Sequence, residues 1–195
     1  MTGVQTCALP IYIFGSIAEQ MLGRAYFIAL YVLAGVMGSL LSGYMSIQDS
    51  YALLAGGVAN ASLLPSVSAG ASGAVMGIGA ALTVLAVLPV LPRQRFILDK
   101  KSLLIIMAIN LAMGFSISGI NNAAHMGGML MGILLSLFWY MGQKWQKTKL
   151  INVIAVVAAT LLCYGFYLYC HSLVAEIAPL WQELIRMMQQ QGFLP

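Results

Sequence analysis

Long apolar stretches alternate with short polar or charged breaks along this chain. At about 1.5 Å of rise per residue, a helix needs about 20 apolar residues to cross the roughly 30 Å hydrocarbon core of a bilayer. Five stretches approach this length and one is shorter, which predicts an all-α, polytopic membrane helical bundle. The partial segment covers Ile11 to Leu22, and the full spans cover Ala25 to Ile47, Ala71 to Leu91, Leu103 to Ile120, Ala123 to Met141 and Leu150 to Cys170.

Two segments outside these spans have a mixed pattern. Gln48 to Ala69 carries one charge, Asp49, and includes the apolar run Tyr51 to Val58, so we expect a loop that dips into the bilayer while packed against protein. Ser172 to Pro195 spaces its apolar residues like one face of a helix, and we expect it to lie on the outer membrane surface. Pro179 interrupts that pattern, so a disordered end is the alternative.

Composition and charge identify a membrane protein and orient it. Apolar residues make up 61% of the chain and charged residues 7%, too few to cover a soluble globule. Short loops kept in the cytoplasm carry most Lys and Arg. Eight of the nine basic residues fall in alternate connections, which are therefore predicted to be cytoplasmic: Arg24, Arg93, Arg95, Lys100, Lys101, Lys144, Lys147 and Lys149. These anchors explain the net charge of +4, and no basic run suggests a nucleic-acid surface.

The cysteines and histidines predict neither a disulfide framework nor a metal site. Cys163 and Cys170 lie seven residues apart on one predicted helix, roughly 10 Å along its axis and beyond disulfide reach. The helix histidines lack the cysteine and carboxylate neighbours that metal ligation would need. We therefore expect no cofactor.

The first eleven residues differ from the rest. Met1 to Ile11, MTGVQTCALPI, is abruptly more polar than the segment it enters and has no cap or charged flank. It resembles the translation of a common sequencing-library adapter. We expect residues 1–11 to be non-native, with the beginning of the partial helix missing from this chain.

A serine and a histidine are predicted at the same end of two different spans. Ser72 stands in Gly70-Ala71-Ser72-Gly73, and His125 stands in Ala124-His125-Met126-Gly127-Gly128. The charge pattern places both in the outer leaflet. Because a serine hydroxyl becomes nucleophilic when a neutral imidazole accepts its proton, the pair predicts a Ser-His dyad. No carboxylate lies in the outer half of the predicted spans, so a dyad is favoured over a triad.

Small residues around Ser72 suit this chemistry. The first backbone N–H groups of a helix have no carbonyl partner and would stabilise an oxyanion, while Gly70 and Gly73 leave room for a substrate backbone beside Ala71. Small residues spaced four apart also allow helices to pack closely. This spacing occurs in Gly73 and Gly77 on one helix and in Gly128 and Gly132 on the other.

Structural roles compete with each of these interpretations. Gly, Ala and Ser often serve only packing in membrane helices. An intramembrane histidine can also be a structural hydrogen-bonder or part of a proton path. His171 ends the last span and suits the membrane interface, with no assigned role. Asn110 and the pair Asn121-Asn122 could bond within the site, although the pair more simply caps the helix of His125.

The motifs resemble the rhomboid intramembrane serine proteases. The likeness runs from about Tyr12 to Trp145 and rests on FGSIAEQMLGRAYFIALYVLAGVMGSLLS (Phe14 to Ser42), GASGAVMG (Gly70 to Gly77) and AHMGGMLMG (Ala124 to Gly132). It implies that Ser72 is the nucleophile, His125 the general base, and single-pass transmembrane proteins the substrates. By this likeness 12–145 is a rhomboid-like core lacking its first helix and 146–171 is an extra C-terminal span. The charge pattern makes 172–195 an outward-facing tail. The resemblance also implies a bacterial plasma membrane location with an extracytoplasmic site.

Two departures from the family pattern stand out. The family usually has a His and an Asn, four residues apart, on the helix represented by Tyr12 to Leu22, where they help to hold the oxyanion. The corresponding positions fall near Gly3 and Cys7, inside the segment expected to be non-native. Met76 stands where the family often has an aromatic ring stacked on the histidine, and its thioether could still pack against His125.

Two other functions remain open. A catalytically inactive relative could bind transmembrane clients, which the presence of both Ser72 and His125 argues against. A small transporter or channel could use His125 to relay protons, with Ser72 lining a path. A transporter or channel is expected to have more polar groups near the bilayer midplane and, usually, internal repeats. This sequence has no internal repeat.

Overall fold

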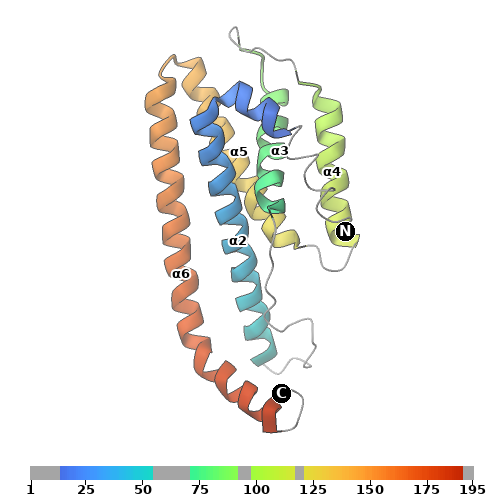
Figure 1. Cartoon of the computed structure of the whole chain (residues 1–195), viewed down its shortest axis with the longest axis vertical. Coiled ribbons are helices and arrows are strands. Elements are labelled where there is room, and N and C mark those ends of the chain that lie inside the picture. The colour runs from blue at the N-terminus through green and yellow to red at the C-terminus, as the bar shows by residue number, and fades with distance from the viewer. Residues whose placement is uncertain (1–13, 55–70, 92–97, 117–120, 191–195) are drawn as a thin grey trace.

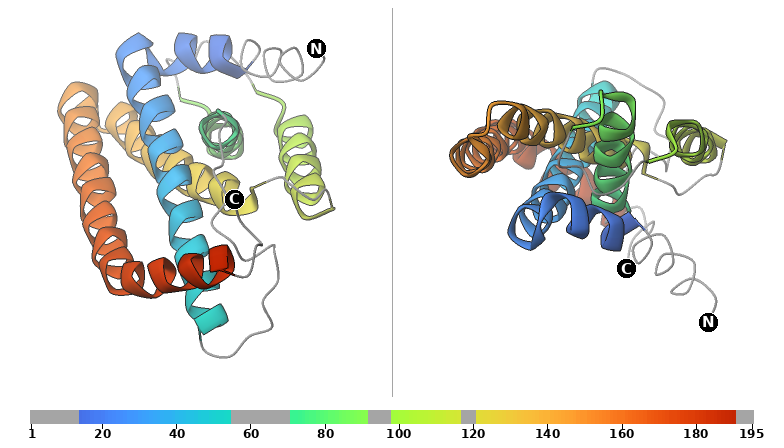
Figure 2. Two further views of the ribbon diagram at one scale, coloured as in Figure 1. Left: turned by 60° about the horizontal axis from the view of Figure 1, so that its bottom comes forward. Right: turned by 90° about the horizontal axis from the view of Figure 1, so that it is seen from above.

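The computed structural model describes residues 14–54, 71–91, 98–116 and 121–190. Its regular structure in these ranges is a short helix over 14–22 followed by α2 (Arg24–Leu54), α3 (Ser72–Val87), α4 (Lys100–Ser116), α5 (Asn122–Lys144) and α6 (Thr148–Gln190). Helix α3 lies between α2, α5 and α4, while α6 packs on α2 and α5 on the side away from α4 (Figures 1 and 2). The predicted all-helical class is confirmed.

Within the described residues, three helices are long and apolar enough to cross a membrane. They are Arg24–Ala52, Asn122–Lys144 and Thr148–Pro179. Helix α3 is apolar but has only 16 residues, so the predicted full span from Ala71 to Leu91 was wrong. Leu88 is extended, with ψ of 154°, because the proline that follows disfavours helical backbone. Helix α4 has 17 residues, and the end of its predicted span, 117–120, lies outside the described residues.

The described part of the predicted partial helix ends where expected, at Leu22. Gly23 has a φ of 83° and its N–H donates to the Glu19 carbonyl at 2.9 Å, which is the left-handed helix ending that glycine favours. The Gly23 carbonyl then accepts from Phe27 N, also at 2.9 Å, and α2 follows directly. The short helix therefore lies across the top of the bundle instead of continuing into α2 (Figure 2).

Helix α2 is longer than predicted. It continues to Leu54, so the first seven residues of the expected loop, Gln48 to Leu54, are helical. No glycine or proline interrupts them, and the buried Ser50 hydroxyl donates to the Ser46 carbonyl at 2.9 Å within the helix. The rest of the predicted loop, 55–69, lies outside the described residues.

Helix α6 joins the last predicted span and most of the tail into 43 residues. It bends between its long upper part and its last turns, which cross beneath the end of α2 (Figure 2). Pro179 lies inside the helix. It has no N–H to donate a hydrogen bond to the preceding turn, and its ring clashes with the carbonyl there, so a helix bends at such a residue. Ile177 is buried, and the Tyr51 hydroxyl donates to Glu176 Oε2 at 3.0 Å. The disordered alternative therefore does not apply to 172–190, and the placement on the membrane surface stays a prediction.

All but one of the described basic residues gather at one end of the bundle, the exception being Arg186 near the end of α6. Helices α2, α4 and α6 begin at this end and α5 finishes there (Figure 1). Six of the eight predicted anchors belong to these helix ends: Arg24, Lys100, Lys101, Lys144, Lys147 and Lys149. The arrangement is the one that the charge pattern predicts, while Arg93 and Arg95 lie outside the described residues.

Glycine backbones form the contact between α3 and α5. A Cβ atom on Gly128 would overlap the Gly73 carbonyl oxygen, and one on Gly132 would overlap the Gly77 oxygen. A Cβ on Gly77 would lie 2.8 Å from the Gly128 oxygen. Any larger residue at these positions must separate the two helices.

We expect Gly128→Ala to destabilise the bundle by about 1–3 kcal/mol, because backbone atoms have to move to admit the added methyl group. Gly165→Ala is the matched control, since a Cβ there has no atom within 4 Å. It should be neutral or stabilising by up to about 1 kcal/mol through helix propensity. Unfolding in mild detergent measures both, and equal stabilities would contradict the proposed packing.

Candidate active site

Ser72 is the first residue of α3, and its side chain is exposed. Ala71 is the N-cap, with φ of −76° and ψ of 4°, and it provides no side-chain cap. The first helical bond runs from Val75 N to the Ala71 carbonyl, at 3.0 Å. The three preceding N–H groups, those of Ser72, Gly73 and Ala74, are thus left without helical partners at the positive end of the helix dipole. The predicted contribution of Gly70 falls outside the described residues.

His125 lies in the first turn of α5 and is buried, with 8% of its surface exposed. Its Nδ1 atom is buried without a hydrogen-bond partner within the described part of the chain. Asn122 Oδ1, three residues earlier on the same face, is also buried and unpartnered. A water molecule or a polar ligand could form the hydrogen bonds that these two buried polar atoms lack.

Asn121 fixes the beginning of α5. Its side-chain oxygen accepts from Ala124 N at 2.9 Å, which confirms the cap predicted for the helix of His125. Its side-chain nitrogen donates to Ser42 Oγ on α2. Ser42 was not among the predicted site residues. It is visible in the sequence as a polar residue within an apolar span, but nothing in the sequence indicates that it contacts Asn121.

The same turn of α5 lies directly against the beginning of α3. A Cβ on Gly73, the residue after Ser72, would lie 2.9 Å from the carbonyl oxygen of Ala124, the residue before His125. A Cβ on Gly38 of α2 would lie 2.6 Å from the same oxygen. The predicted serine and histidine therefore start adjacent helices at one level, although no hydrogen bond joins them in the described structure.

The other predicted residues divide into two groups. Met76, Gly77, Gly128 and Gly132 are buried where α3 and α5 meet the rest of the core, as packing roles require. Asn110 is exposed and donates to the Ile106 carbonyl of its own helix at 2.8 Å, so the suggested bond within the site is wrong. His171 is exposed on α6, its ring 6.1 Å from that of Tyr167.

Comparison with known proteins bears on this arrangement. The rhomboid protease AarA of Providencia stuartii is 28% identical over 90% of this chain, and the rhomboid protease GluP of Bacillus subtilis (strain 168) is also 28% identical over 90%. The chain covers 66% of the first relative and 32% of the second, so it is shorter than either. No solved structure matches it significantly.

The profile of the rhomboid domain matches residues 6–144. The matched segment contains the beginnings of α3 and α5, together with the glycines that pack them. Because the match covers well over half of the chain, this protein belongs to the rhomboid family.

Proposed function

We propose that this protein is an intramembrane serine endopeptidase in which Ser72 is the nucleophile and His125 the general base. The observation that carries the proposal is the contact of Gly73 with the Ala124 carbonyl, which brings the beginnings of the two helices together. Both relatives, in different bacteria, are named as rhomboid proteases. A cleavage site inside the bilayer also accounts for a serine and an ionisable residue at one level of a membrane bundle.

The reaction follows from the positions of these groups. His125 accepts the proton of Ser72 Oγ as that oxygen attacks the carbonyl carbon of the substrate peptide bond. The oxyanion that forms receives hydrogen bonds from free N–H groups at the beginning of α3. The imidazolium then protonates the leaving amine, which leaves an ester on Ser72. Water, deprotonated by His125, hydrolyses the ester and restores both side chains.

The surroundings of His125 support a dyad. Its Nδ1 atom has no carboxylate partner within the described residues, so the ring's orientation depends on burial and on the packing of α5. The unpaired Asn122 Oδ1 nearby offers a second polar contact for an incoming water molecule. Hydrolysis needs such a water inside an otherwise apolar bundle.

We assign the substrates to the class of single-pass transmembrane proteins, as the family implies, and place the site on the extracytoplasmic side. The basic end of the bundle is the expected cytoplasmic end. Helices α3 and α5 begin away from it (Figure 1). The location that best fits these features is a bacterial plasma membrane.

The second candidate function is binding of transmembrane clients without cleavage. The observation that favours it is the missing hydrogen bond between Ser72 and His125 in the described structure. In enzymes without substrate, however, catalytic hydrogen bonds are often long and tighten only when substrate binds. Activity measurements separate the two functions directly.

We expect Ser72→Ala and His125→Ala each to reduce cleavage of a tagged single-pass protein in liposomes by roughly a thousandfold or more, because either change removes a group that the chemistry requires. Ser116→Ala and His171→Ala are matched controls in exposed positions and should cleave like the unmodified chain. Labelling of Ser72 by a fluorophosphonate should also require His125. A folded protein that captures the substrate but neither cleaves it nor reacts would instead be a client binder.

Asn121 should act as a positioning residue. Asn121→Ala removes the cap and the bond to Ser42, and we expect a loss of about 1 kcal/mol in stability together with slower cleavage. Asn121→Asp keeps the capping acceptor but cannot donate to Ser42, so its stability should fall less. A lower kcat with an unchanged KM in both variants supports positioning. An unchanged kcat in Asn121→Ala would show that the cap is only structural.

A further inference from the structure

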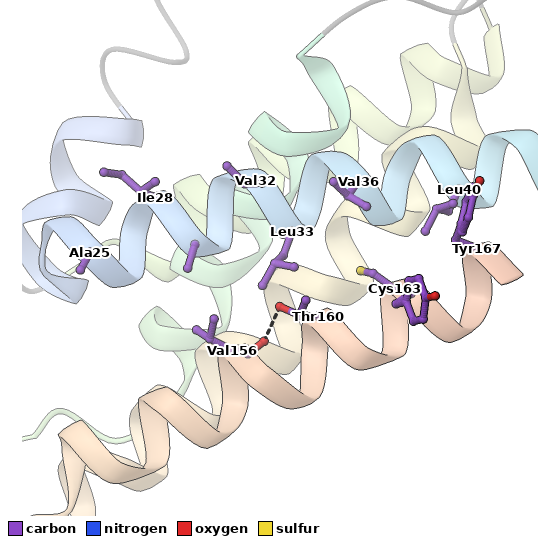
Figure 3. Close-up of a pocket in the computed structure, with 12 residues that line it drawn as sticks. Ala25, Ile28, Val32, Leu33, Val36, Leu40, Val156, Thr160, Cys163 and Tyr167 are labelled. Atoms are coloured by element: carbon purple, nitrogen blue, oxygen red, sulfur yellow. Dashed lines mark hydrogen bonds between the residues drawn. The ribbon is translucent and has the colours of Figure 1, made fainter.

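A groove of about 630 Å³ runs between α2 and α6, and neither Ser72 nor His125 is among the residues that line it. Figure 3 shows Leu33 of α2 pointing toward α6 and Leu40 beside Tyr167, while Val156 and Cys163 of α6 point toward α2. The lining also includes Ile28, Val32 and Val36 of α2. The lining is apolar apart from Thr160 and two tyrosines. The Thr160 hydroxyl donates to the Val156 carbonyl of its own helix at 2.8 Å, so it needs no ligand.

The dimensions of the groove favour a hydrocarbon chain over a helix. On α6 the lining extends from Val156 to Tyr167, about 16 Å at about 1.5 Å per residue, which is close to the roughly 15 Å depth of one leaflet. A transmembrane helix about 10 Å in diameter would occupy roughly 1,250 Å³ over that length, about twice the space present. Both walls belong to helices that can cross the membrane, so the groove opens to lipid.

Charge at one end of the groove identifies the kind of lipid. Arg24 begins α2 directly before the lining residue Ala25, and Lys147 and Lys149 flank the beginning of α6. All three are exposed and, within the described ranges, none has a carboxylate partner. Glu19 is exposed in the preceding helix, and the end remains net positive. Clusters of basic residues at the cytoplasmic ends of transmembrane helices bind anionic headgroups.

We propose that this α2–α6 groove binds one anionic phospholipid, with an acyl chain between the two helices and the phosphate headgroup against Arg24 and Lys149. The lipid would fill the groove between α2 of the rhomboid domain and α6. Such a site differs from general attraction to an anionic surface, because it needs both the groove and the charges at its end.

The test uses the full chain reconstituted in vesicles of equimolar phosphatidylcholine and phosphatidylglycerol, then released for native mass spectrometry. We expect the unmodified protein to retain one phosphatidylglycerol in preference to phosphatidylcholine. Arg24→Gln combined with Lys149→Gln should lower that occupancy by about fivefold for each charge removed. Lys100→Gln with Lys101→Gln removes the same charge at the same end, but on α4, and should leave occupancy unchanged (Figure 1).

A second pair of variants tests the groove itself. Ala29 lines it, so Ala29→Phe should displace the lipid, whereas Ala158→Phe adds the same bulk to an exposed position of α6 outside the lining. Equal losses in the two charge variants would show diffuse surface attraction and overturn the proposal. Retention of the lipid by Ala29→Phe would also overturn it. If the unmodified protein is a dimer and Ala29→Phe is a monomer, the groove is a contact between two copies, and the proposal is overturned as well.

Discussion

The close approach of glycine backbones on α3 and α5 is the contact on which the site depends. Membrane helices gain little from the hydrophobic effect when they associate, since lipid tails are as apolar as their side chains. Backbone contact at Gly73 with Gly128 and at Gly77 with Gly132 gives the van der Waals packing that replaces it. The same contacts fix the register of the two helices. A slip of one turn would displace one helix along the other by about 5.4 Å, which is longer than a hydrogen bond. Such a slip would prevent the hydrogen bond between Ser72 and His125 that the proposed reaction requires.

Helix α2 completes this arrangement by holding α5 at two levels. Near the site, Ser42 accepts a hydrogen bond from Asn121, and Gly38 lies against the Ala124 carbonyl. Toward the basic end, the buried Tyr26 hydroxyl donates to the Leu135 carbonyl at 2.8 Å. Two hydrogen bonds at separate depths resist both sliding and rotation of α5. Polar groups thus act as fixed points in a core that is otherwise apolar.

The peripheral helices are attached differently. Helix α4 has a largely exposed surface and few buried residues, Leu103 and Gly114, while α6 follows the outer side of α2 and α5 and leaves the apolar groove beside them. The rhomboid domain match ends at residue 144, before α6 begins. The candidate active site therefore belongs to the central helices α2, α3 and α5. Helix α6 adds an apolar outer surface and a bent end that reaches the last turn of α2.

The sequence by itself determined the membrane class, the helical pattern, the charged end of the bundle and the residue types able to perform serine chemistry. These follow from local properties, because transfer into lipid and the charge of a loop can be read residue by residue. The ends predicted for α2 and α3 from hydropathy were wrong, because the position of a helix end depends on hydrogen bonds and prolines. Only the tertiary structure decided which glycines touch, that Asn121 reaches Ser42, and that α2 and α6 leave a groove. Each depends on how distant helices rotate and slide to bring backbone atoms together, and hydrophobic periodicity alone does not specify that choice.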